Sequence, residues 1–158
     1  IVTTGNEVLA GKILYNPAYD LVVLRQGDSR VVINPQTMKS FRYYDEGANI
    51  NRKFITAQGN GFGEIYEVVV AGQIMVLRRG KAECGPSPSD ADGYNYFFVR
   101  DGAIQALRKF RNRLYPEIKN ALAGEMKKQH LNPNHDADVI RLIEIYNSRQ
   151  FTASLARK

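Results

Sequence analysis

A glycine-rich stretch at residues 59–67, GNGFGEIYE, comes closest to a motif that could do chemistry. Closely spaced glycines before a strand let backbone N–H groups approach the phosphates of ATP, and a lysine on the next strand then contacts the α and β phosphates. Here the glycines are Gly59, Gly61 and Gly63, so the third falls one residue early for the pattern G-x-G-x-x-G. The next apolar segment carries Arg78 and Arg79 where the lysine is needed.

The rest of a nucleotide-dependent phosphotransfer site is also missing from the sequence. No H-R-D-x-x-x-x-N or D-F-G motif follows to hold Mg²⁺, and fewer than 80 residues remain after Arg79. We interpret the glycine stretch as a connection before a β-hairpin that turns at Ala71-Gly72. We predict that it binds no nucleotide.

The remaining chemically versatile residues do not form an active-site pattern. His130 and His135 are separated by an Asn-Pro break, so they are not the i, i+4 pair of a metal-binding helix. Asp136 and Asp138 leave a surface metal site as the alternative to a capped polar turn. Cys84 is the single cysteine, and no serine has nucleophile-elbow surroundings. We therefore predict no catalytic, cofactor-binding or metal-binding residues, no cofactor and no enzymatic activity.

A basic cluster is the one group of residues with a specific binding chemistry. We define it as Arg108, Lys109, Arg111 and Arg113, four cations within six residues. Such a cluster can contact phosphates or another anionic surface with release of counterions. The alternative is a solvated helix face whose arginine stems cover apolar surface. The sequence thus offers a possible anion-contact patch.

Composition places the chain among ordinary globular domains. Of the 158 residues, 44% are hydrophobic and 24% are charged, which excludes disordered and fibrous classes. The net charge of +6 is mildly basic. No apolar run reaches the roughly 20 residues that cross a bilayer, so we expect no transmembrane segment.

The elements that must position these residues change in character once along the chain. Up to about residue 100, β-branched and aromatic residues come in short runs bounded by turn residues, which is typical of strands. The predicted strands are Val8 to Tyr15, Tyr19 to Arg25, Arg30 to Ile33, Thr37 to Tyr44, Lys53 to Ala57, Glu64 to Val70, Gln73 to Arg79 and Tyr94 to Arg100.

Two further segments separate the strands from the helices. Residues 80–93 have no periodicity and several helix and strand breakers, so we expect an exposed loop. Asp101-Gly102 then favours a β-hairpin whose partner strand is Ala103 to Leu107. The alternative is that Asp101 caps a helix through this segment.

From residue 108 onward the apolar residues follow a helical period. Phe110, Leu114 and Ile118 are spaced by four residues, and Pro116 divides the segment. We predict a short helix ending near Tyr115, a second from Pro116 to about Gln129, and a third capped by Asn134 or Asp136. Its buried face is formed by Val139, Leu142, Ile143 and Tyr146.

The predicted fold class is α+β. An N-terminal antiparallel β meander, closed as a barrel or a sandwich, carries a C-terminal appendage of two to three helices. The predicted organisation is a β-rich body at 1–107, a helical region at 108–150 packed on it, and a frayed tail at 151–158.

Three stretches carry a resemblance to a family: TGNEVLAGKILYNPAYDLVVL, INPQTMKSFRYYDEG and KKQHLNPNHDADVIRLIEIYNS. In these the chain resembles a group of uncharacterised exported proteins of Bacteroidetes. The shared positions are of turn, cap and packing types: Gly11, Phe41, Tyr44, Asp45, Leu131, Asn132, Tyr146 and Asn147. The resemblance implies a periplasmic or envelope location and a β-rich body with a helical C-terminus, and it implies no activity.

These observations together give a functional expectation. We expect a non-enzymatic envelope protein, a binding or accessory module whose partner is another envelope protein or an anionic polymer. One alternative is a basic protein that binds nucleic acid or an anionic polymer, and another is an enzyme or small-ligand carrier whose site only the fold assembles. The sequence opens at Ile1 without an initiator methionine, which indicates processing or trimming, so the lack of a signal peptide here does not argue against export. With the location that the resemblance implies, we expect a periplasmic or envelope protein after removal of a signal peptide.

Overall fold

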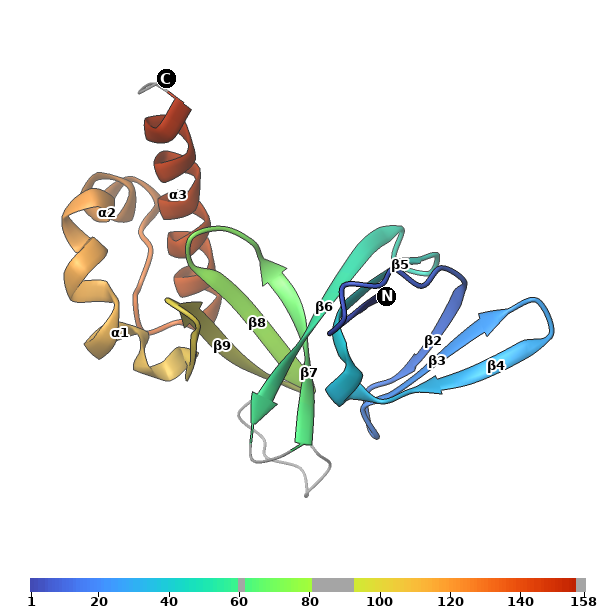
Figure 1. Ribbon diagram of the computed structural model, residues 1–158. Helices are drawn as coiled ribbons and strands as arrows, with labels where there is room; N and C mark the ends of the chain where they lie inside the picture. The colour runs from blue at the N-terminus through green and yellow to red at the C-terminus, as the bar shows by residue number, and fades with distance from the viewer. Residues whose placement is uncertain (60–61, 81–92, 156–158) are drawn as a thin grey trace. The chain divides into compact units, whose positions relative to one another are not determined.

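The computed structural model describes residues 1–59, 62–80 and 93–155. It shows a mixed α+β fold in which antiparallel strands come first and the α-helices last (Figure 1). The strands are β1 Val2–Thr3, β2 Lys12–Asn16, β3 Leu21–Gln26, β4 Ser29–Ile33, β5 Met38–Asp45, β6 Ile50–Gly59, β7 Phe62–Val70, β8 Met75–Gly80, β9 Tyr94–Arg100 and β10 Ala103–Ala106.

The helical elements all follow β10 except for one short turn. A 3₁₀ turn, η1 Pro35–Thr37, precedes β5, and a second, η2 Leu107–Lys109, leads into the helices. The α-helices are α1 Phe110–Arg113, α2 Tyr115–Gln129 and α3 Asp136–Leu155. The predicted order of strands followed by C-terminal helices is confirmed.

The described strands form two sheets. One has seven strands in the order β1-β5-β6-β7-β8-β9-β10, and the other has three in the order β2-β3-β4. A barrel requires the first and last strands of a sheet to pair. Within the described residues these sheets stay open, so the barrel alternative is wrong. The residues after Ala106 form helices and not a further strand, and apolar side chains of these helices pack against those of the last strands. The sandwich alternative for the whole β region stays a prediction.

The chain divides into two compact units, each with its own core. Unit 1 contains residues 1–68 and 79–94, and unit 2 contains residues 69–78 and 95–158. The boundaries fall within β7, β8 and β9. Unit 1 is formed mainly by strands, whereas unit 2 contains all the α-helices.

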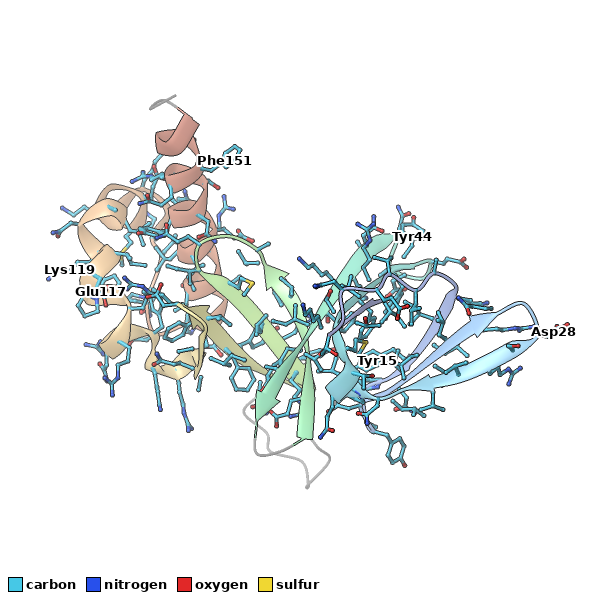
Figure 2. The ribbon with its side chains drawn as sticks, in the orientation of Figure 1. Tyr15, Asp28, Tyr44, Glu117, Lys119 and Phe151 are labelled. Atoms are coloured by element: carbon cyan, nitrogen blue, oxygen red, sulfur yellow. The ribbon has the colours of Figure 1, made fainter. Side chains whose placement is uncertain are left out.

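The core of unit 1 lies between two layers of strands. Val22 and Leu24 of β3 share one hydrophobic cluster with Phe41 of β5 and Phe54 of β6. Phe41 and Phe54 stack with ring centroids 4.5 Å apart. Tyr15 of β2, labelled in Figure 2, meets the Phe54 ring edge-on at 5.0 Å. Successive side chains of a strand point to opposite faces, so alternate residues of β3, such as Val22 and Leu24, enter this core.

The core of unit 2 is built by helices on short strands. Phe110, Leu114 and Ile118 form the predicted apolar stripe, Leu122 continues it, and each of the four is at most 3% exposed. They pack with strand residues and with Val139, Leu142 and Ile143 of α3. Tyr146, predicted for the same buried face, is only partly buried against this core.

Several predicted boundaries need correction. The first long strand begins at Lys12 and not at Val8, which makes only an isolated bridge with Val2. Asp101 and Gly102 adopt φ values of 50° and 78°, and β9 pairs with β10, so the hairpin prediction is confirmed. α3 begins at Asp136, with Asp136 and Asp138 in its first turn, and the predicted cap by Asn134 or Asp136 stays a prediction.

Two predicted segments fall partly outside the described residues. Of the exposed loop at 80–93, residues 81–92 lie outside them, and these include Cys84. Of the tail at 151–158, residues 151–155 belong to α3 and 156–158 lie outside. Among the helices of the described residues, none combines the length and apolar character needed to span a bilayer.

Candidate functional site

The basic cluster lies where the chain of unit 2 turns from strand to helix. Arg108 and Lys109 belong to the 3₁₀ turn η2, and Arg111 and Arg113 belong to α1. All four side chains are exposed. The turn forms because Leu107, Phe110 and Leu114 are drawn into the core at 1–2% exposure, which leaves the intervening cations to solvent.

The cations of the cluster differ in their contacts. Arg111 Nη1 donates a hydrogen bond of 3.1 Å to Asn134 Oδ1 in the loop before α3. Within the described residues, the side chains of Arg108, Lys109 and Arg113 make no hydrogen bond or ion pair. Arg111 and Asn134 are 23 residues apart and lie in different elements, so no local sequence signal could have revealed their contact.

Arg100, close to the cluster in the sequence, is neutralised in the fold. Its guanidinium hydrogen-bonds the Glu117 carboxylate and lies 3.4 Å from Asp101 Oδ2. The hydrogen bond to Glu117 raises the pKa of Arg100. The structure therefore separates a paired arginine from a neighbouring group of cations that have no carboxylate partner in the described residues.

The glycine stretch joins β6 to β7, and Gly59 is paired with Phe62 across the two strands. Residues 60–61, which include Gly61, lie outside the described residues. Arg79 lies on the strand that would carry a phosphate-binding lysine, but its guanidinium is paired with two carboxylates of unit 1. Its two terminal nitrogens lie 2.7 Å from Asp20 Oδ2 and 2.6 Å from Glu64 Oε1. This pairing gives Arg79 a structural role within unit 1.

Two hollows in the described residues have volumes in the range of small-ligand sites. One, of about 670 Å³, lies in unit 2 between the β7–β8 turn and α3. Its polar side chains are already engaged locally. Arg141 pairs with Glu144, Ser148 Oγ donates to the Glu144 carbonyl, and Asn147 bonds to backbone groups of the turn. This hollow therefore offers few polar groups for a small ligand.

The second hollow, of about 490 Å³, lies in unit 1 beside β2 and β5. Lys12 and Arg42 bring positive charge to its lining, while Asp45 is paired with Arg52 at 2.7 Å. In the described part of the chain, every buried side-chain nitrogen or oxygen has a hydrogen-bond partner. The exposed side chains of Lys12, Arg42 and Glu46 remain in the lining of the second hollow without a hydrogen-bond or ion-pair partner in the described residues.

The sequence leaves a surface metal site as one alternative for the segment at 130–138. His130 ends α2 in the left-handed region with φ 52°, and Asp138 Oδ2 accepts a 3.1 Å hydrogen bond from the Asn132 N–H. Within residues 1–59, 62–80 and 93–155, no group of three or more His, Cys, Asp or Glu side chains is arranged to hold a metal ion. The loop is organised by asparagine and aspartate hydrogen bonds.

The comparisons with known proteins find no family model, no curated protein and no solved structure that matches the chain.

Proposed function

We propose that this protein is a non-enzymatic binding module that contacts a linear anionic polymer through the basic cluster. The observation that supports this most directly is the exposure of Arg108, Lys109 and Arg113 without any carboxylate partner in the described residues. Three neighbouring cations repel one another, and this repulsion is relieved when phosphates or sulfates bind.

The alternative use of the arginine stems, to cover apolar surface, has less support. Phe110 and Leu114 are each 1% exposed and belong to a cluster of twelve buried residues from strands and helices. Arg100, Arg141 and Arg149 of the same unit each pair with a carboxylate, Arg149 with Glu125 at 2.9 Å. The basic cluster is thus a local excess of charge and is not part of the pairing pattern of this unit.

Replacement of Arg108 and Arg113 by alanine tests the proposal, because neither side chain has a partner whose loss would affect folding. We expect binding of a fluorescent heparin oligosaccharide, followed by anisotropy, to weaken by about tenfold or more. The slope of log K against log salt should fall by roughly 0.7 to 0.9 for each lost contact. Single-stranded RNA serves as a second probe.

The matched control is Lys127→Ala with Lys128→Ala, which removes two exposed cations from the last turn of α2 in the same unit. Equal weakening by both pairs would show that net charge alone attracts the polymer, and the cluster would lose its special role. Unchanged binding in the Arg108/Arg113 variant would contradict the proposal.

A periplasmic or envelope location is part of the same proposal and rests on the resemblance to exported proteins of Bacteroidetes. A surface module there meets anionic polysaccharides and lipids. Fractionation of cells that express the full gene tests the location, and recovery with cytoplasmic markers would contradict it.

A further inference from the structure

The outer face of the three-stranded sheet places three cations in a single cross-strand row. The register pairs Lys12 of β2 with Arg25 of β3, and Arg25 with Arg30 of β4. Directly opposed residues point to the same face of a sheet, with Cβ atoms about 5 Å apart. Val22 and Leu24, the neighbours that point the other way, are buried at 0% and 2% exposure. The row of three cations therefore faces solvent.

This row is unfavourable for folding. Like charges directly opposite one another destabilise a sheet. All three side chains are exposed, and no carboxylate pairs with any of them within the described residues. Arg25 Nε donates only to the Gly27 carbonyl, at 3.0 Å. Asp28 in the β3–β4 turn, labelled in Figure 2, is the nearest acid in the sequence and forms no ion pair with the row.

An aliphatic row lies beside the cationic one. Two residues further along the strands, Leu14 pairs with Val23, and Val23 pairs with Val32. Leu14 is 48% exposed and Val32 is 64% exposed, while Val23 is partly buried. The strand rise places the two rows about 7 Å apart. The core needs none of these three side chains, because Val22, Leu24 and Ile33 on the inner face supply it.

We propose that this outer face, defined by Lys12, Arg25 and Arg30 with Leu14, Val23 and Val32, docks on an anionic lipid bilayer. Charge complementarity selects an anionic occupant. The aliphatic row favours an anionic occupant that also has an apolar layer just below its charges. A lipid bilayer has such a layer, whereas a polysaccharide or a nucleic acid backbone does not. Interfacial binding scales with buried apolar area plus attraction to anionic headgroups.

The inference is independent of the basic cluster, because the two surfaces belong to different units. Variants in one unit therefore report on one surface. Each cation near an anionic bilayer raises the affinity by about fivefold, the equivalent of about 1 kcal/mol. Removal of two cations should thus be measurable by vesicle sedimentation.

The first experiment compares vesicles of phosphatidylcholine with vesicles that also contain phosphatidylglycerol in equal amount. We expect binding only to the anionic vesicles. Arg25→Gln with Arg30→Gln should weaken it by at least tenfold, and Leu14→Ser with Val32→Ser by several-fold. The control pair, Lys39→Gln with Lys53→Gln, removes two exposed cations of unit 1 outside this sheet and should change binding by less than about threefold.

The second experiment uses the absence of tryptophan from the chain. Val32→Trp places a single fluorophore in the aliphatic row, and Ile50→Trp places one on β6 as the control. We expect the emission of the first to shift to the blue and to be quenched by brominated lipid on addition of anionic vesicles, and the second to stay unchanged.

Three results would overturn the proposal. These are equal binding to neutral vesicles, unchanged vesicle binding in the Leu14/Val32 variant, and loss of vesicle binding in the Arg108/Arg113 variant alone. The second result, together with heparin binding that depends on Arg25 and Arg30, would assign the face to a soluble polyanion. Circular dichroism of each variant verifies that these exposed substitutions leave the fold intact.

Discussion

Tyr66 is a buried phenol whose ionisation the fold opposes. Its ring is 5% exposed, its hydroxyl hydrogen-bonds the Glu64 carboxylate, and the Arg79 guanidinium carbon lies 5.9 Å from the ring centroid. Burial, followed by the hydrogen bond to Glu64, raises the pKa of Tyr66 from 10 to about 12. The neutral phenol is therefore the form that the folded state selects.

This shift predicts a loss of stability in alkali. Because the folded pKa lies above the unfolded one, the contribution is complete below pH 10 and is lost as the pH rises through about 12. Tyr66→Phe should flatten the pH dependence of the unfolding free energy between those values. At pH 7 it should cost about 1 kcal/mol through the lost hydrogen bond. Urea titrations followed by circular dichroism provide the measurement, and an unchanged slope in alkali would contradict the prediction.

At the scale of elements, Asn147 of α3 holds the turn between β7 and β8. Its Nδ2 donates to the Ile74 carbonyl at 2.8 Å, and its Oδ1 accepts from the Ile74 N–H at 3.1 Å. Gly72 in the same turn has φ 150°, and a Cβ there would lie 2.4 Å from Asn147 Nδ2. The contact gives a structural role to one of the residues that carry the family resemblance.

Asn147→Ala should therefore destabilise the protein by about 2 kcal/mol, because the buried backbone groups of Ile74 lose their partners. Gly72→Ala should also destabilise it, through the positive φ and the close approach. Asn120→Ala, an exposed change on α2, is the control and should stay within about 0.5 kcal/mol. Equal thermal midpoints for the Asn147 and Asn120 variants would rule out this role.

Most elements could be predicted from local signals, whereas their contacts could not. The β9–β10 hairpin follows from Asp101-Gly102 alone, because that pair favours the required φ values. The contact between Asn147 and Ile74 joins residues 73 positions apart, and no periodicity encodes it. Of the two predicted alternatives, barrel and sandwich, the barrel was wrong, because strand composition does not determine whether the terminal strands of a sheet meet.

The basic cluster and the cationic row of the three-stranded sheet also differ in how far the sequence predicts them. The basic cluster is contiguous in sequence, so its residues could be predicted, although its partnerless state depends on the fold. The row of Lys12, Arg25 and Arg30 was missed, because it exists only through strand register. One pair of the row could have been predicted from the sequence, because a two-residue turn at Gly27-Asp28 places Arg25 opposite Arg30.

At the scale of the whole molecule, the two units have separate hydrophobic clusters without a shared member. Cooperative unfolding depends on shared buried contacts. A substitution in the core of one unit should therefore destabilise that unit and leave the stability of the other unchanged. Leu142 is 0% exposed in unit 2, and its replacement by alanine should cost about 2–5 kcal/mol there.

Hydrogen exchange followed by mass spectrometry tests this separation. In Leu142→Ala, exchange should accelerate in α2 and α3, while the amides of β2, β3 and β4 should keep their protection. Phe41→Ala, in the cluster of unit 1, is the reciprocal variant and should give the opposite pattern. Uniform acceleration over both units would show that the chain unfolds as one cooperative body.

The three-stranded sheet also has a consequence for the colloidal behaviour of the protein. Among the described strands, β2 and β4 are both edges of this sheet, and an uncovered edge can pair with a strand of another molecule. Lys12 and Arg30 place one charge on each of these edges, so two copies that approach edge to edge repel one another. Salt weakens this repulsion, since the screening length falls from about 10 Å at 0.1 M to about 3 Å at 1 M. The protein should therefore stay monodisperse at low ionic strength and self-associate through these edges as salt is added.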